Sequence, residues 1–224
     1  MKLQFPRLSH VDKSRLKKLI APLYSYIYST RIKKSGRGHK IEWSDAILRN
    51  CNISIHGHSN ILKFGKGCRL RNTEIRIEGD NCLIEIGNRC CWSGILVAED
   101  DNSEISIGSD STAIHATIVS SEGQPIILGD DCMISKNVDI RSSDGHSIID
   151  PDTGKRMNPA RSITIGNHVW IGAGVTILKG VEIGNGSIVG CQSLVTQIIE
   201  ECSLALGIPA KVIRQPIAWK RERI

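Results

Sequence analysis

The chain has 224 residues, of which 40% are hydrophobic and only 4% aromatic, and it carries a formal net charge of +6. No segment reaches 18 consecutive apolar residues, which argues against a membrane-spanning helix, and the eight cysteines form no C-x-x-C pair, which argues against a zinc ribbon. The basic excess is confined to residues 1–40, where eleven lysines and arginines face one acid, Asp12, so the rest of the chain is slightly acidic.

Residues 12–34 are predicted to form a basic amphipathic helix, because apolar residues recur there at three- and four-residue steps. Pro22 would end or kink this helix near Ala21. Two interpretations stay open: the helix packs on its own domain or a neighbouring subunit, or it lies on an anionic membrane face. Residues 1–10 lack the apolar run of a signal peptide. We therefore expect a cytoplasmic protein, peripheral at the inner face of the membrane under the second interpretation.

After a Ser-Gly-Arg-Gly link at 35–38, one motif marks successive turns of the chain: two aliphatic residues one apart, then Gly, then a polar residue. It begins at Leu62, Ile84, Ile105, Ile126, Ile163 and Val181. In sequence number these starts are separated by 22, 21, 21, 37 and 18, so the longest step holds one turn and an insertion. We therefore predict a loop at 144–162, and a long polar loop in a regular solenoid is usually functional.

From Ile165 to Ile199 the chain has a strict six-residue period. Every sixth residue is aliphatic and β-branched (Ile165, Ile171, Ile177, Ile183, Val189, Val195), and the residue four places on is small or branched (Val169, Val175, Val181, Ser187, Ser193, Ile199). Neither a helix nor a flat alternating strand has this period. It suits a triangular coil of three hexads per turn, with the aliphatic side chain inside and Gly or Asn at corners, where they tolerate positive φ.

The low aromatic content and the scattered cysteines agree with a thin coil. Several cysteines fall at repeat positions where a small apolar residue would serve. We therefore interpret them as free thiols that fill the core in a reducing cytoplasm.

His146 stands where a coil gives way to the predicted loop. A rigid scaffold would hold an imidazole there within reach of the surface, which suits a general base near neutral pH. A surface histidine without a role is the alternative. Asp144, two residues earlier, would be placed to orient the ring.

Trp170 occupies the last place of a hexad, a position that should point outward. An exposed indole needs a partner, which would be either another subunit or an organic ligand lying against the coil. Ala173 and its flanking glycines leave room for a thin ligand. Three cations would then meet phosphates or remain solvated charges: Lys179, Lys211 and Arg214.

Three strings resemble the hexapeptide-repeat acyltransferases: Ser143-Asp-Gly-His146, the run from Ile163 to Val181, and Gly207-Ile-Pro-Ala-Lys-Val-Ile-Arg214. The resemblance covers residues 50–214. It implies an all-β, left-handed parallel β-helix, a homotrimer, and an acetyl-CoA-dependent O-acetyltransferase acting on a carbohydrate. The loop sequence Asp-Gly-His-Ser-Ile-Ile-Asp resembles the branch that O-acetylates capsular and other surface polysaccharides.

The resemblance also implies roles around the acceptor. His146 falls on the catalytic histidine of the family and would take the proton from a sugar hydroxyl. Trp170 falls where this branch lines the acceptor or coenzyme A site, and Asp144 is placed with the substrate. Galactoside-type relatives carry an Asn-x-Asn where this chain has Ala113-Ile-His115, so His115 would hold the acceptor instead.

On the donor side, Ala173 and Cys191 lie three hexads apart, which is one coil, and fall on positions whose backbone contacts the pantetheine arm. The resemblance places Lys211 and Arg214 on the pair that meets the nucleotide phosphates. The remaining donor-site residues are expected beside these: Lys179, Thr196 and Gln197.

Three other functions share parts of this pattern. An N-acetyltransferase of a nucleotide-linked amino sugar would share the fold. A metal-dependent β-helix would need three histidines on one zinc, but His115, His146 and His168 do not sit at the same phase of successive coils. A purely structural solenoid would show outward threonine ladders, which are missing. We expect no metal and no nucleic-acid partner.

Three segments are predicted: a basic helical segment at 1–40, a β-helix at 41–206, and a C-terminal extension at 207–224 with a short basic helix at 218–223.

Overall fold

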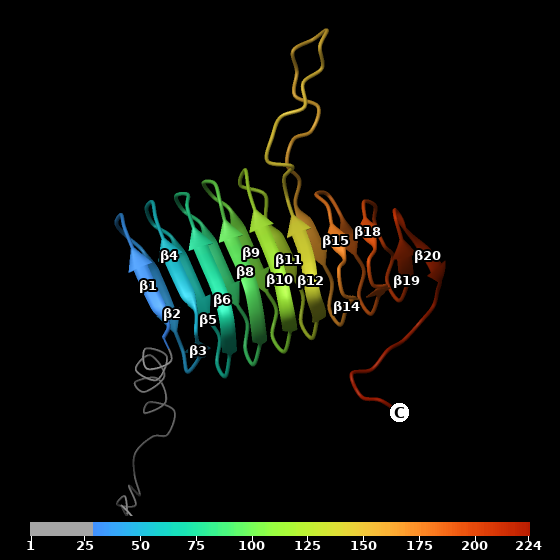
Figure 1. The fold of residues 1–224 in the computed structure, drawn as a ribbon, viewed down its shortest axis with the longest axis horizontal. Coiled ribbons are helices and arrows are strands. Elements are labelled where there is room, and N and C mark those ends of the chain that lie inside the picture. Colours follow the sequence, from blue (N-terminus) through green and yellow to red (C-terminus); the bar gives the residue numbers. More distant parts are fainter. Residues whose placement is uncertain (1–28) are drawn as a thin grey trace, which may run out of the picture.

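The computed structural model describes residues 29–224, which form a parallel β-helix with three faces (Figure 1). One face is a seven-stranded parallel sheet, called face 3 here. Its strands follow one another coil by coil: β2 (Lys40–Trp43), β5 (Ile61–Phe64), β7 (Leu83–Ile86), β9 (Glu104–Ile107), β11 (Ile126–Leu128), β13 (Ile163–Ile165) and β16 (Glu182–Ile183). The all-β parallel solenoid predicted from the hexads is confirmed.

A thirteen-stranded sheet makes the other two faces, because its long strands bend from one face onto the next. The long strands are β6 (Arg69–Ile77), β8 (Cys91–Ala98), β10 (Thr112–Ser120) and β12 (Met133–Arg141). Their first halves form face 1 with β3 (Ile47–Arg49), β14 (Trp170–Ile171), β17 (Ile188–Val189) and β19 (Leu204–Gly207). Their second halves form face 2 with β1 (Arg31–Lys34), β4 (Asn52–Ile55), β15 (Thr176–Ile177) and β18 (Leu194–Val195).

The bends between faces 1 and 2 need unusual backbone. Asn72 and Asn137 have positive φ at the bends of β6 and β12, where asparagine tolerates the left-handed region. Gly94 plays this part in β8, with φ of 136°, and a Cβ there would meet the Ala116 carbonyl oxygen at 2.0 Å.

The core is the column of inward side chains that the hexads predict. All six β-branched residues of the first row, from Ile165 to Val195, are at most 2% exposed, and the second row is equally buried. The register pairs Ile171 with Val189 and Ile177 with Val195, so one turn takes three hexads. Each turn of three hexads therefore adds three fully buried aliphatic side chains of the first row to the column, at roughly 1.5–3 kcal/mol for each.

Free cysteines line one edge of this column. The thiols of Cys68, Cys90 and Cys132 donate to backbone carbonyls of the next coil, at 2.7, 3.1 and 3.2 Å, and Ser111 does the same at 3.0 Å in the same series. Cys51 and Cys82 are also buried, whereas Cys91 and Cys191 are exposed. Burial raises the pKa of the Cys132 thiol, which keeps it protonated and unreactive.

The glycine of the repeated motif has a different role from the one predicted. Gly108 and Gly129 do not have positive φ; a Cβ on Gly108 would meet the Gly129 backbone carbon at 2.3 Å, so the residue allows two coils to approach. Positive φ falls two residues later in the motif, at Asp110, Asp131 and His168 among others. Gly174 and Gly180 do fit the prediction, with φ of 71° and 76°.

Both terminal helices need correction. The predicted helix at 12–34 lies mostly outside the described residues, and its end, Arg31–Lys34, is strand β1 paired with β4. The helix predicted at 218–223 is wrong: after β20 (Ala210–Arg214), which runs antiparallel to β19, the chain crosses back without a helix. Residues 29–224 contain no helix that could cross a membrane.

Candidate active site

A long loop leaves the coil after β12 and returns before β13, as the longest step between motifs predicts (Figure 1). Its two ends are tied together because the Arg161 amide donates to the Ser142 carbonyl at 2.9 Å. Ser142 is fully buried, and its hydroxyl accepts from the Ser121 amide of the previous coil at 2.9 Å. The arm itself is a narrow hairpin in which the Met157 amide donates to the Ile148 carbonyl. The two ends of the loop, which we call the loop base, are therefore held in place by the coil.

Asn158 organises the part of the loop that carries His146. The residue is only 8% exposed. The amide nitrogen Nδ2 donates to the Asp144 carboxylate at 2.7 Å and to the His146 carbonyl at 2.9 Å, while Oδ1 accepts from the Ile148 amide at 2.6 Å. One buried side chain therefore fixes the backbone on both sides of the histidine.

The loop base also holds Lys179, which comes from the next coil. Its ammonium group bonds the Asp144 carboxylate and the Asn158 carbonyl, the latter at 3.0 Å. The bonds from Lys179 and then Asn158 lower the pKa of Asp144. Asp144 therefore faces Lys179 and not the His146 ring, contrary to its expected orienting role. Lys179 anchors the loop here and does not stand free for a phosphate.

A second ion pair ties the arm to the preceding coil. Arg156 donates two bonds to the Glu122 carboxylate, at 2.6 and 2.8 Å, and the Ser143 hydroxyl donates a third at 2.6 Å. These bonds, from Arg156 first and Ser143 second, lower the pKa of Glu122 to about 2. Glu122 lies one coil before Ser143, a spacing that the sequence shows but that carried no signal without the loop's path.

The His146 imidazole is exposed, and within residues 29–224 neither ring nitrogen has a bonding partner. The anchored backbone and the free ring together suit a group that meets an incoming hydroxyl. His115 is also exposed, but it lies at the bend of β10 on the opposite side of face 2.

Trp170 points outward, as predicted, with 37% of its surface exposed. The C-terminal segment crosses beside it: the Trp219 ring lies 5.8 Å from the Trp170 ring and stacks on His168 at 4.0 Å and 8°. The Trp219 indole N–H donates to the His168 carbonyl at 2.9 Å, and His168 Nδ1 bonds Asp131 at 2.6 Å. No repeat pattern in the sequence signalled Trp219 as a support for this site.

Arg221 fastens the end of the same segment. It donates to the Asp131 carboxylate at 2.7 Å and to the Cys132 carbonyl at 3.0 Å, on the coil before Trp170 along the solenoid. Partial burial raises the pKa of Asp131, but the bonds from His168 and Arg221 outweigh this effect and lower it. We call residues 215–224 the C-terminal strap.

The predicted donor-site residues separate onto different edges of the prism. Ala173 and Cys191 lie at the corner between faces 1 and 2, where the Gln192 amide donates to the Ala173 carbonyl at 2.8 Å. Thr196 and Gln197 are exposed just after β18, on the loop's edge, and Lys211 and Arg214 are exposed on β20. Neither of these two cations has a side-chain bonding partner within residues 29–224.

One chain does not bring His146 and Trp170 together. Trp170 pairs with Met133 at the start of β12, whereas the loop leaves from Arg141 at the end of the same strand. A nine-residue strand with one bend therefore separates the two residues that were expected to share a site. Nor do three or more His, Cys, Asp or Glu side chains gather in the described chain as a metal site would require.

Comparison with known proteins supplies independent findings. The family model described as bacterial transferase hexapeptide (six repeats) matches residues 162–197. A polysialic acid O-acetyltransferase from Neisseria meningitidis is 31% identical over 191 residues, which cover 84% of this chain and 89% of that protein. The putative lipopolysaccharide biosynthesis O-acetyl transferase WbbJ of Escherichia coli is 30% identical over 75% of this chain and 80% of its own length.

Solved structures agree with the sequence relatives. The crystal structure of the polysialic acid O-acetyltransferase OatWY superposes with a TM-score of 0.84 at 28% identity, covering 87% of this chain and 93% of that one. The polysialic-acid-specific acetyltransferase NeuO gives a TM-score of 0.77 at 31% identity, covering 87% and 90%. These neighbours are left-handed β-helices, and the predicted hand of the solenoid is thereby confirmed.

Proposed function

Because the chain belongs to the hexapeptide-repeat O-acetyltransferases, we propose that it transfers an acetyl group from acetyl-CoA to a sugar hydroxyl of a capsular or O-antigen polysaccharide or its precursor. The observation that carries the proposal is the exposed imidazole of His146 on a loop fixed from both sides. The relatives that cover most of the chain are named for polysialic acid and lipopolysaccharide, and both are surface glycans.

His146 would act as the general base. Its free ring nitrogen would accept the proton of the sugar hydroxyl as that oxygen forms a bond to the thioester carbonyl carbon. The carbon–sulfur bond then breaks, and the thiol of coenzyme A leaves with a proton. Because the oxygen attacks directly, no acyl-enzyme is needed. The Asn158 bond to the His146 carbonyl supplies the positioning that such a base requires.

The donor would lie along the coils after the loop. Lys211 and Arg214 are exposed cations whose side chains have no partner in the described chain, which fits a phosphate-bearing ligand. Ala173 lies between two glycines at a corner with little side chain, which fits a thin arm lying against the backbone. Acetyl-CoA would supply the activated acyl group at this position.

A complete site would require a second copy of the chain. His146 and Trp170 lie on different edges of one prism, so the loop of one protomer would reach the Trp170 edge of its neighbour in a homotrimer. Cyclic symmetry would repeat this contact three times. The proposed site therefore takes its base from one protomer and its indole from the next.

The first test removes the base. His146→Ala should lower turnover by about 10²-fold or more, the range for general base catalysis. The melting temperature should not change, because the residue is exposed and its ring makes no hydrogen bond or ion pair in the described chain. His58→Ala, an exposed histidine that bonds Asp80 on an early coil, is the matched control and should keep full turnover. Retained turnover in His146→Ala would remove the base from this mechanism.

The second test examines the shared site. Trp170→Ala and His146→Ala should each be weakly active alone. When the two variants are unfolded, mixed equally and refolded together, roughly a quarter of the sites should combine an intact histidine with an intact indole. Recovery of about that fraction of wild-type activity supports a site between protomers, and no recovery contradicts it. Size-exclusion chromatography with light scattering on each variant confirms the assembly.

A further inference from the structure

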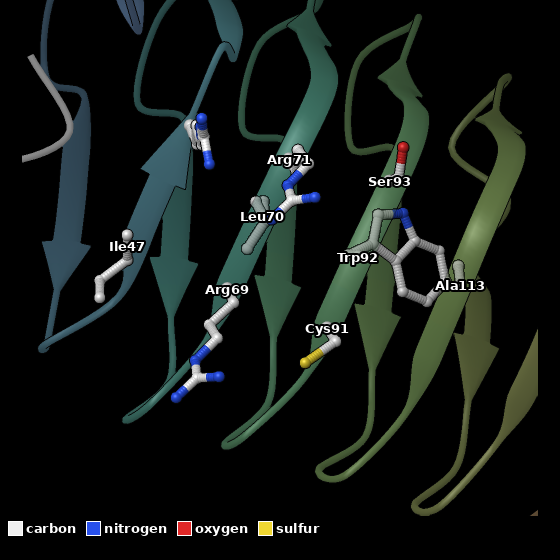
Figure 2. A pocket seen from close by; sticks show the side chains of 9 residues that line it. Ile47, Arg69, Leu70, Arg71, Cys91, Trp92, Ser93 and Ala113 are labelled. Carbon is white, nitrogen blue, oxygen red and sulfur yellow. The ribbon is translucent and has the colours of Figure 1, made fainter. Parts of the chain in front are cut away.

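Face 1 carries a second feature, far from the loop and unused by the proposed chemistry. A cavity of about 460 Å³ opens there over strands β3, β6, β8 and β10. Figure 2 shows Arg69 and Arg71 on β6 beside Trp92 on the neighbouring strand β8. We call this cavity the arginine cleft. Its size is within the usual range of small-molecule and sugar sites.

Three arginines line the arginine cleft, Arg49, Arg69 and Arg71, and the charges of the last two are not compensated within the described chain. No aspartate or glutamate of the described chain lines it. Arg69 and Arg71 are both exposed, and neither guanidinium has a hydrogen bond or ion pair within residues 29–224. By contrast, Arg76, on the face 2 half of the same strand, pairs with Glu74 and Glu78 at 3.5 and 3.7 Å. Arg69 and Arg71 are therefore left free to meet an anionic ligand.

The donors that the arginine cleft offers are its arginines. Trp92 lines the cleft, but it is 2% exposed and its side chain is part of the core column, so its indole N–H does not serve a ligand there. The two free guanidinium groups form a set made only of donors. Carboxylates with neighbouring hydroxyls and carbonyls are the matching acceptors.

The floor of the cleft suits a sugar. Cys91 and Ser93 present small side chains, so a flat ring can approach the sheet. The same face continues coil by coil through β10 and β12 to Trp170 on β14. Outward residues along this path, among them Ile114 and Ser135, include no acid. Four coil steps of about 4.8 Å place β6, which carries Arg69 and Arg71, roughly 19 Å from Trp170.

We propose that the arginine cleft binds carboxylates of an acidic glycan at sugars remote from the one that is acetylated. The inference rests on the proposed function, because it assigns the cleft to the acceptor polymer. The donor would then occupy the coils after the loop and the acceptor the coils before it. Such a site would favour long acidic chains over short or neutral ones, since only a polymer reaches both the cleft and Trp170.

Binding to the full-length protein tests the proposal without any need for turnover. The probe is a fluorescent sialic acid octamer, with its carboxyl methyl ester as the neutral counterpart. Arg69→Ala with Arg71→Ala should weaken binding of the octamer by about tenfold or more, as the loss of two charge-assisted contacts predicts. Arg71→Lys should lose less, and Arg76→Ala, the paired arginine of the same strand, should bind like the wild type. The ester should bind weakly to all.

Kinetics separate the cleft from the chemistry. The double variant should raise KM for a long acidic acceptor by about tenfold and leave kcat unchanged, since it removes binding shared by ground and transition states. His146→Ala should still bind the octamer. If the wild-type protein binds the octamer but transfers no acetyl group to it, the proposed reaction is contradicted and the assignment of the cleft is not.

Three results would overturn the assignment. The first is equal octamer binding by the double variant and the wild type, with turnover intact. The second is wild-type protein that binds the octamer no better than the ester. The third is displacement of the octamer by phosphate to the same extent as by an equal concentration of unlabelled octamer, which would make the cleft a general anion site. Each readout uses a folded variant, checked by its melting temperature, and Arg71→Lys replaces the double variant if that one fails to fold.

Discussion

The coils before the active-site loop and those after it share one core but differ in length. Before the loop a turn is longer than three hexads and its strands reach nine residues; after it a turn takes three hexads and most strands are only two residues long. Inward positions are equally buried in both halves. The core therefore fixes the stacking, and the extra residues of the early coils change only surfaces and corners.

This difference in surface matches the two proposed binding functions, donor binding on the short coils and acceptor binding on the long ones. The residues expected to meet the donor, Ala173 to Arg214, belong to the short coils. The arginine cleft belongs to the long ones, and the loop with His146 is inserted at the border between them. A uniform solenoid would have one repeating surface. A change of coil length at the reaction centre gives two different surfaces, one for each substrate.

The largest effect is expected where neighbouring coils approach most closely, at the motif glycines. Substitutions there test whether the coils before and after the loop are equally close together. Gly108→Ala in a long coil and Gly184→Ala in a short one would each place a Cβ 2.3 Å from backbone of the next coil. Each should lower the free energy of unfolding by about 3 kcal/mol or more, the upper end for overpacking. Thermal and urea unfolding measure this loss.

The control for that pair is Gly154→Ala in the loop, which has φ of 66° and open space around it. It should cost only the strain of the left-handed backbone, about 1–2 kcal/mol. A small effect at Gly108 together with a large one at Gly184 would show that the two halves stack differently.

The C-terminal strap joins the two halves, so its removal should loosen the border. Trp219→Ala loses the stack on His168 and the support beside Trp170. The expected cost is about 2 kcal/mol, below the ~3–5 of a core tryptophan because the strap can relax at the surface. Trp219→Phe keeps a ring on His168 and should lose only the N–H bond, about 1 kcal/mol. Equal losses in the two variants would contradict the stacking role.

Lys179 lies in a short coil but contacts the loop. A variant at this position therefore tests whether the side chain anchors the loop or binds the phosphates of the donor. As an anchor for Asp144 and Asn158, it positions His146; Lys179→Met should then lower kcat by about tenfold with KM for acetyl-CoA unchanged. Lys211→Met is the matched control and should raise KM for acetyl-CoA instead. A raised KM in Lys179→Met would return this residue to the phosphate role expected from its position in the sequence.

The sequence was most informative where one residue type repeats. The rows headed by Ile165 and Val169 predicted the coil and its turn of three hexads, because the inside of a narrow prism accepts only aliphatic or small side chains. The spacing of the repeated aliphatic-glycine motif predicted the inserted loop. The same rule predicted that cysteines would be buried free thiols, and the structure buries five of the eight, among them Cys68, Cys90 and Cys132. His146 could be named because it stands where a coil gives way to the loop, and Trp170 because a large indole occupies an outward place of a hexad.

The contacts that build the site could not be predicted in the same way. Asn158 and Glu122 act across a loop and a coil, and nothing in their local sequence marks them. Trp219 depends on the path of the strap, which the expected helix at 218–223 misplaced. The motif glycines were predicted to have positive φ. Glycine is instead required there because two neighbouring coils approach too closely for a Cβ, and this approach depends on two turns together.

The smallest expected effect concerns the loop's hold on the long coils in acid. The Arg156 and Ser143 bonds lower the pKa of Glu122 to about 2, from an ordinary 4.5. A lowered pKa in the folded state means that the contribution is present above pH about 4.5 and is lost as pH falls through about 2. Hydrogen exchange of the arm, corrected for intrinsic rates, should therefore speed up across this window by about fivefold, the scale of an exposed ion pair.

Glu122→Gln should exchange fast already at pH 6 and show a smaller acid step, because only Asp144 still titrates at the loop base. Glu85→Gln, which breaks the Lys63 pair on face 3, should leave the arm's exchange unchanged. An arm that stays protected at pH 6 in Glu122→Gln would show that Asn158 and Lys179 hold the loop alone, and that the long coils contribute nothing to the position of His146.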